Sequence, residues 1–158
     1  WERMAVFYVK ACGQGAGSVR TTPVFGDALV RYKVAQDDYT VMGQGLVKLA
    51  QALLAAGATE VHSPLTGAPP LTSASQADQL ASVLSPKTAS FSAIHLHSTV
   101  RMGDRAAGCG ADSYGRLYDA DNVCVNDSSL LPTSPGVNPQ GTILAVARRN
   151  TLRWLDER

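Results

Sequence analysis

The sequence predicts an α+β fold in which a mostly antiparallel sheet carries helices on one side. Short segments rich in β-formers occupy the first part of the chain and are joined by connections of hairpin length. Longer segments with apolar residues at helical spacing follow them. The chain has 158 residues, of which 45% are apolar and 17% charged, so it is long and apolar enough to bury a core.

The first elements are predicted as strands and turns. Residues 4–12 are short, aromatic and β-branched, and the glycine-rich residues 13–17 end them. Pairing resumes over residues 19–22, and residues 23–27 form the next turn. Residues 28–34 alternate apolar and polar side chains, which predicts a second strand antiparallel to the first. The glycine cluster lacks the spacing and the following helix of a dinucleotide-binding loop, so we interpret it as a turn.

A helix is predicted next, over residues 38–56. Asp37 or Asp38 caps its beginning, and Gly57 closes it. Leucines and valines recur there at helical spacing, which indicates one buried face.

The middle of the chain carries shorter elements. Residues 58–62 are predicted as a short strand, and a capping sequence at residues 72–75 begins a short helix that Pro86 stops. Residues 91–103 are predicted as a strand that carries two histidines, and residues 117–125 as a turn leading into a buried strand.

The last element, residues 142–155, is predicted as a helix with arginines in and after its later turns. The chain opens without methionine and inside strand-like sequence, so we expect a C-terminal portion of a larger protein or one piece of a split protein.

Composition excludes several classes of function. A net charge of +1 gives no electrostatic case for binding nucleic acid or an anionic membrane surface. No apolar run approaches the ~20 residues of a membrane-spanning helix, and no secretory signal is visible. Three cysteines are too few for a disulfide framework, and their odd number favours a reducing, cytoplasmic location.

The predicted histidine strand would point His95 and His97 to the same face. Such a pair could ligate a metal ion with a third ligand from Cys109, Asp104 or Asp112, although no spacing in the chain favours any of them. We therefore predict no metal site but keep a metal-dependent enzyme as an alternative. A histidine is also a candidate general base.

Asn138 and Pro139 stand where the last helix begins. Proline is favoured at a first helical position, and the free backbone amides of Gln140, Gly141 and Thr142 would form an anion site at the positive end of the helix dipole. A ring that gains negative charge on reduction, such as a flavin, would be stabilised there. An ordinary helix start capped by Asn138 is the alternative.

The chain resembles the C-terminal part of the glucose–methanol–choline oxidoreductases in three sequence blocks, which follow one another in the family's order: residues 95–103, 115–132 and 136–149. The resemblance is specific from His95 to Arg149 and looser over residues 1–86. It implies a substrate-domain sheet whose last strand and helix return to complete a Rossmann-like FAD domain that lies elsewhere. It also implies a substrate-binding region over residues 1–103 and a segment over residues 104–158 that completes the FAD-binding domain.

The resemblance further implies FAD as cofactor and oxidation of the CH–OH group of a small alcohol by hydride transfer to flavin N5. The FAD-binding N-terminal portion would come from another subunit or an unseen segment, and the electron acceptor is not identified. His95 would be the catalytic base and Asn138 its partner. The flavin contacts it implies are Asp127 and Ser128 along the ribityl chain, and Asn138, Pro139, Gln140 and Thr142 at the pyrimidine end.

Departures from the family pattern concern the histidine region. Leu96 and Ser98 stand where the family often has proline and glycine, and His97 is an unusual addition that leaves open which histidine is the base. The rival interpretation is a non-catalytic or split-subunit partner that shapes a substrate pocket or interface without flavin chemistry of its own.

Overall fold

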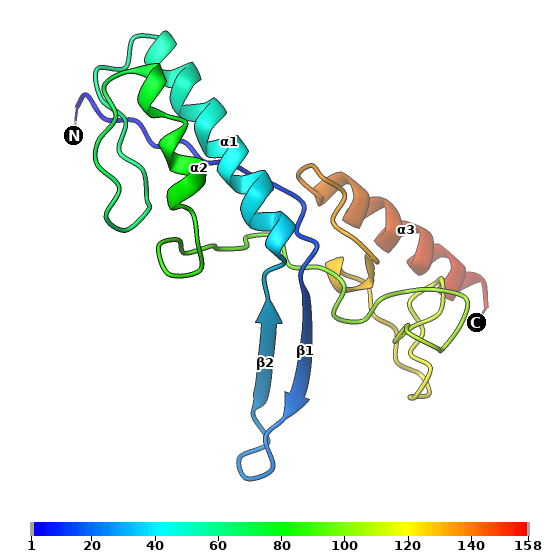
Figure 1. Ribbon diagram of the computed structural model, residues 1–158. Coiled ribbons are helices and arrows are strands. Elements are labelled where there is room, and N and C mark those ends of the chain that lie inside the picture. The colour runs from blue at the N-terminus through cyan, green and yellow to red at the C-terminus, as the bar shows by residue number, and fades with distance from the viewer. Residues whose placement is uncertain (1, 158) are drawn as a thin grey trace. The chain divides into compact units, whose positions relative to one another are not determined.

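The computed structural model describes residues 2–157, which form a first compact unit up to Ser92 and a second from Ala93 (Figure 1). The described residues contain three α-helices, two short 3-10 helices and one two-stranded antiparallel sheet. This confirms an α+β fold, with a sheet smaller than the sequence predicted. The predicted division at residue 103 concerns substrate and FAD regions of a larger protein and stays a prediction. None of the helices described is long and apolar enough to cross a membrane.

The sheet is a hairpin of β1 (Ala16–Thr21) and β2 (Ala28–Lys33), paired with Val19 opposite Val30. The turn between them is closed by the Thr22 amide, which donates to the Asp27 carbonyl at 2.8 Å, as the predicted turn requires. The predicted strand over residues 4–12 is wrong, because these residues form no regular element. A strand needs a partner for its backbone groups, and the described chain offers this segment none.

Helix α1 (Gln36–Ala55) begins before the predicted start, so Asp38 lies in its first turn rather than ahead of it. The buried Asp38 carboxylate accepts hydrogen bonds from the amides of Gln14 at 2.8 Å, Gly15 at 3.2 Å and Ala35 at 3.0 Å. This side chain joins the glycine-rich segment to the helix start. A Cβ on Gly15 would lie 2.4 Å from the Lys33 carbonyl oxygen, which explains a glycine there.

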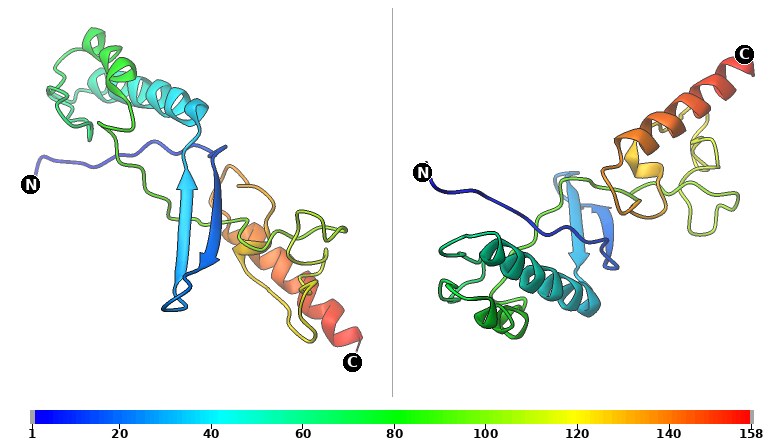
Figure 2. Two further views of the ribbon diagram at one scale, coloured as in Figure 1. Left: turned by 60° about the horizontal axis from the view of Figure 1, so that its bottom comes forward. Right: turned by 90° about the horizontal axis from the view of Figure 1, so that it is seen from above.

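The core of the first unit lies where α1 packs against the 3-10 helix η1 (Ala74–Gln76) and α2 (Gln79–Val83). Figures 1 and 2 show α2 running beside α1. The predicted short helix is thus confirmed, as is the end of α1, where Gly57 has a φ of +100°. The predicted strand over residues 58–62 is reduced to one bridge. The buried apolar side chains are Ala50, Leu65, Leu71, Ala77 and Leu80.

The second unit packs irregular loops against the long helix α3 (Gln140–Asp156), which confirms the last predicted helix (Figure 2). The predicted strands over residues 91–103 and 117–125 are wrong, since these stretches contain only isolated bridges. Ser98 and Asn122 have positive φ angles of 67° and 60°, and such residues interrupt an extended strand. The 3-10 helix η2 (Ser128–Leu130) precedes α3.

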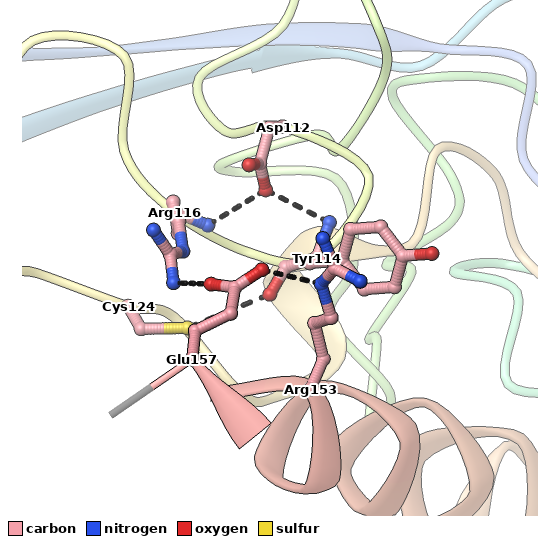
Figure 3. A network of polar contacts seen from close by, with 6 residues as sticks. All are labelled: Asp112, Tyr114, Arg116, Cys124, Arg153 and Glu157. Carbon is pink, nitrogen blue, oxygen red and sulfur yellow. Dashed lines mark hydrogen bonds and ion pairs between the residues drawn. The ribbon is translucent and has the colours of Figure 1, made fainter. Parts of the chain in front are cut away.

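A polar network fastens the loop after residue 111 to the end of α3 (Figure 3). The Asp112 carboxylate accepts from the amides of Tyr114 at 2.8 Å and Arg116 at 3.0 Å. Arg116 and Arg153 both form ion pairs with Glu157, and the Arg153 guanidinium lies 5.4 Å from the centre of the Tyr114 ring. Exposed ion pairs contribute little to stability each.

Candidate active site

An open groove of about 370 Å³ in the second unit is the candidate site. Its lining comes from the loop that carries the histidines and from the beginning of α3. The residues that line it are His95, Asn138, Pro139, Gln140, Ile143 and Leu144. The fold therefore brings together a histidine and an asparagine that the sequence places far apart, together with two residues predicted to contact a cofactor.

The beginning of α3 lies at this groove and leaves its first backbone amides uncapped. Pro139 is buried, and its carbonyl accepts the first helical hydrogen bond from the Ile143 amide at 2.9 Å. Among residues 2–157 no side chain caps the helix, and its first turn holds no acidic residue. The Asn138 side chain thus makes no capping hydrogen bond to the first turn of α3. The free amides and the helix dipole leave partial positive charge at this end.

The helix surface outside the groove is open at the next residue of this turn. A Cβ placed on Gly141 would meet nothing within 4 Å, so the helix surface there is open. Asn138 and Gln140 are exposed and free to turn toward a bound group, whereas Thr142 is exposed but does not line the groove.

The two histidines differ in their surroundings. Because residues 91–103 form no strand, the alternation that would point both rings to one face is lost. His95 is half-buried and lines the groove, whereas His97 is half-buried and does not. The Nδ1 atom of His97 is buried without a hydrogen-bond partner among the described residues.

Asp127 and Ser128 lie outside the groove and organise the turn before α3. The Asp127 carboxylate accepts from the Ser129 amide at 2.8 Å and from the Ser129 hydroxyl. These two bonds, the hydroxyl first, lower the pKa of Asp127 from its usual value, against a smaller opposing effect of burial. The Ser128 hydroxyl donates to the Leu96 carbonyl at 2.8 Å, so this turn contacts the histidine loop.

The alternative of a metal centre finds no support in the side-chain arrangement. Among residues 2–157 no three histidine, cysteine or acidic side chains gather closely enough to hold an ion. Cys109, Asp104 and Asp112 therefore do not join the histidines as the sequence alternative required.

The groove also contains two apolar residues of α3 for which the sequence predicts no role in the site. Ile143 and Leu144 follow Pro139 and Gln140 at helical spacing, so they lie on the same side of α3. Their membership could be anticipated from this spacing once Pro139 is taken as the helix start.

Comparison with known proteins gives a consistent result. A family model described as GMC oxidoreductase matches residues 17–147. An uncharacterised GMC-type oxidoreductase of Sinorhizobium fredii is 38% identical over 150 residues, which cover 94% of this chain and 30% of that protein. A 6'''-hydroxyparomomycin C oxidase of Streptomyces lividus is 44% identical over 57 residues, 36% of this chain and 10% of the relative.

A long-chain-alcohol oxidase of Arabidopsis thaliana is 25% identical over 147 residues, which cover 85% of this chain and 19% of that protein. The chain spans less than a third of the length of the curated relatives that it matches. The family match extends over most of the described residues and includes the groove at the start of α3. The chain therefore belongs to the GMC oxidoreductase family and corresponds to the C-terminal part of that family's proteins.

Proposed function

We propose that the complete protein is an FAD-dependent oxidoreductase that oxidises the CH–OH group of an alcohol, with His95 as the catalytic base. The observation that carries the proposal is the groove that His95 shares with Asn138 and the first turn of α3. The relatives named as long-chain-alcohol oxidase and hydroxyparomomycin oxidase support a CH–OH donor.

The residues at the groove fit a flavin. Uncapped amides at the start of α3, with no acidic side chain in that turn, suit the end of a ring that becomes anionic. Asn138, Pro139 and Gln140 would hold the pyrimidine end at the groove, and Thr142, which follows in the same helical turn but does not line the groove, would contact it from outside. Asp127 would lie along the ribityl chain, whereas the Ser128 hydroxyl is already bonded to the Leu96 carbonyl and is not assigned to the flavin. FAD, when bound, supplies the acceptor for the carbinol hydride at N5.

This chain's own residues would handle the proton and the substrate oxygen. His95 accepts the hydroxyl proton. General base catalysis by a positioned imidazole raises the rate about 10²–10⁴-fold. The Asn138 amide donates a hydrogen bond to the same oxygen and orients it. The FAD-binding portion must come from polypeptide outside this chain, with residues 104–158 completing that domain and residues 1–103 contributing to the substrate domain.

The test uses the complete protein, mixed anaerobically with primary alcohols while its visible absorbance is followed. We expect His95→Gln to retain the flavin bands and to slow alcohol-dependent bleaching by about 10²–10⁴-fold. Asn138→Ala should slow it less. His62→Gln is the matched control, because His62 is exposed in the first unit and lies 3.5 Å from the Glu60 carboxylate.

Normal bleaching in His95→Gln would reject this residue as the base, and loss in His97→Gln alone would transfer the role to His97. A complete protein that binds no flavin would favour the non-catalytic partner. Oxygen consumption compared with reduction of an artificial quinone then distinguishes an oxidase from a dehydrogenase.

A further inference from the structure

The segment that carries both histidines, residues 94–98, is held in place by two serine hydroxyls. Ser128 donates to the Leu96 carbonyl at 2.8 Å, and Ser98 donates to the Leu131 carbonyl at 2.8 Å. Within the described residues these are the hydrogen bonds that the segment makes. Backbone bonds to the same turn begin only further along, where the Val100 amide donates to the Ser129 carbonyl at 3.1 Å.

Apolar packing does not hold this segment. The side chains that flank His95 are exposed, Ile94 by 81% and Leu96 by 68%. Both serine bonds connect the segment to residues 128–131. This stretch is well packed, because Leu130 and Leu131 are 0% and 5% exposed. The hydroxyls therefore fasten an otherwise loosely held loop to a well-packed part of the unit.

We propose that Ser128 is a positioning residue for the catalytic histidine, acting through the Leu96 carbonyl that lies between His95 and His97 in the chain. Ser98 supports the same segment from its other end. This inference rests on the proposed function and deepens it. It gives Ser128 a role different from the flavin contact that the family resemblance implies, since its hydroxyl proton is committed to Leu96.

Loss of the bond would let the histidine move relative to the groove. A misplacement of about 1 Å costs up to about 10²-fold in rate. We therefore expect Ser128→Ala in the complete protein to lower kcat by about 10- to 100-fold, with KM and flavin content unchanged. Ser128→Thr retains a hydroxyl and should recover most of the rate.

The matched control is Ser82→Ala. Ser82 also donates to a backbone carbonyl at 2.8 Å, that of Gln79, but in the first unit. Hydrogen exchange adds a readout that does not depend on activity. The Val100 amide, which donates to the Ser129 carbonyl just after the segment, should exchange about fivefold faster or more in Ser128→Ala, as the loss of one hydrogen bond of about 1 kcal/mol implies, and should be unchanged in Ser82→Ala.

Ser98→Ala provides a second variant if Ser128→Ala folds poorly, and it should accelerate exchange of the same Val100 amide. The proposal is overturned if Ser128→Ala loses flavin at unchanged kcat, or if exchange of the Val100 amide equals that in the control. Failure of the unmodified protein to oxidise any alcohol would overturn the proposed function as well, whereas normal kcat and normal exchange in Ser128→Ala overturn only this inference.

Discussion

Asp38→Ala should destabilise the first unit more than any change to its exposed neighbours. The buried carboxylate accepts from three backbone amides, those of Gln14, Gly15 and Ala35. Hydrogen bonds to charged groups contribute about 1.5–3 kcal/mol each, but the amides freed near the surface regain water. We therefore expect a loss of about 2–4 kcal/mol rather than the full sum of about 4.5–9 kcal/mol.

The assay is urea unfolding of the complete protein, combined with hydrogen exchange at residues 14, 15 and 35. Local exchange is included because a larger protein need not unfold in one transition. Asp37→Ala is the matched control, since Asp37 is exposed in the same helical turn and acts only on the helix dipole, worth about 0.3–1 kcal/mol. If Asp38→Ala cost no more than Asp37→Ala, the carboxylate would not be what joins the glycine-rich segment to α1.

Two further predictions concern the second unit. Gly115→Ala should destabilise it by about 2 kcal/mol or more, because Gly115 has a φ of +87° and an added Cβ would lie 2.3 Å from the Val125 carbonyl oxygen; an unchanged urea midpoint would contradict this. The pKa of Asp127 is lowered in the folded protein from its usual value of 3.8. The ionised Asp127 carboxylate therefore contributes its full stabilisation above pH 3.8, and this contribution is lost as the pH falls through the lowered pKa. Between pH 5 and pH 3, the urea midpoint should thus fall more steeply in the unmodified protein than in Asp127→Asn, and parallel curves would refute it.

Local pattern was sufficient for the helices. The apolar spacing of α1 and α3, Gly57 at the end of α1 and Pro86 after α2 act within one or two turns of chain, so the sequence alone predicts them. The hairpin of β1 and β2 was predicted for the same reason, since its partners are joined by one short turn.

Strands that need distant partners were predicted wrongly. Residues 4–12, 91–103 and 117–125 have β-forming composition, yet their pairing depends on backbone that comes from elsewhere in the fold. The positive φ of Ser98 is likewise a tertiary outcome, since serine has no intrinsic preference for that conformation, and its hydroxyl bond to Leu131 helps to offset the cost.

By itself, the sequence determined the helices, the hairpin and the family, because helix periodicity and motif order are local properties of the chain. Only the tertiary structure decided that His95 lies at the same groove as Asn138 and the uncapped start of α3, and that Ser128 reaches Leu96. Such contacts depend on how loops fold back over one another. The spacing of two residues along the chain carries no information about the distance between them in the folded protein.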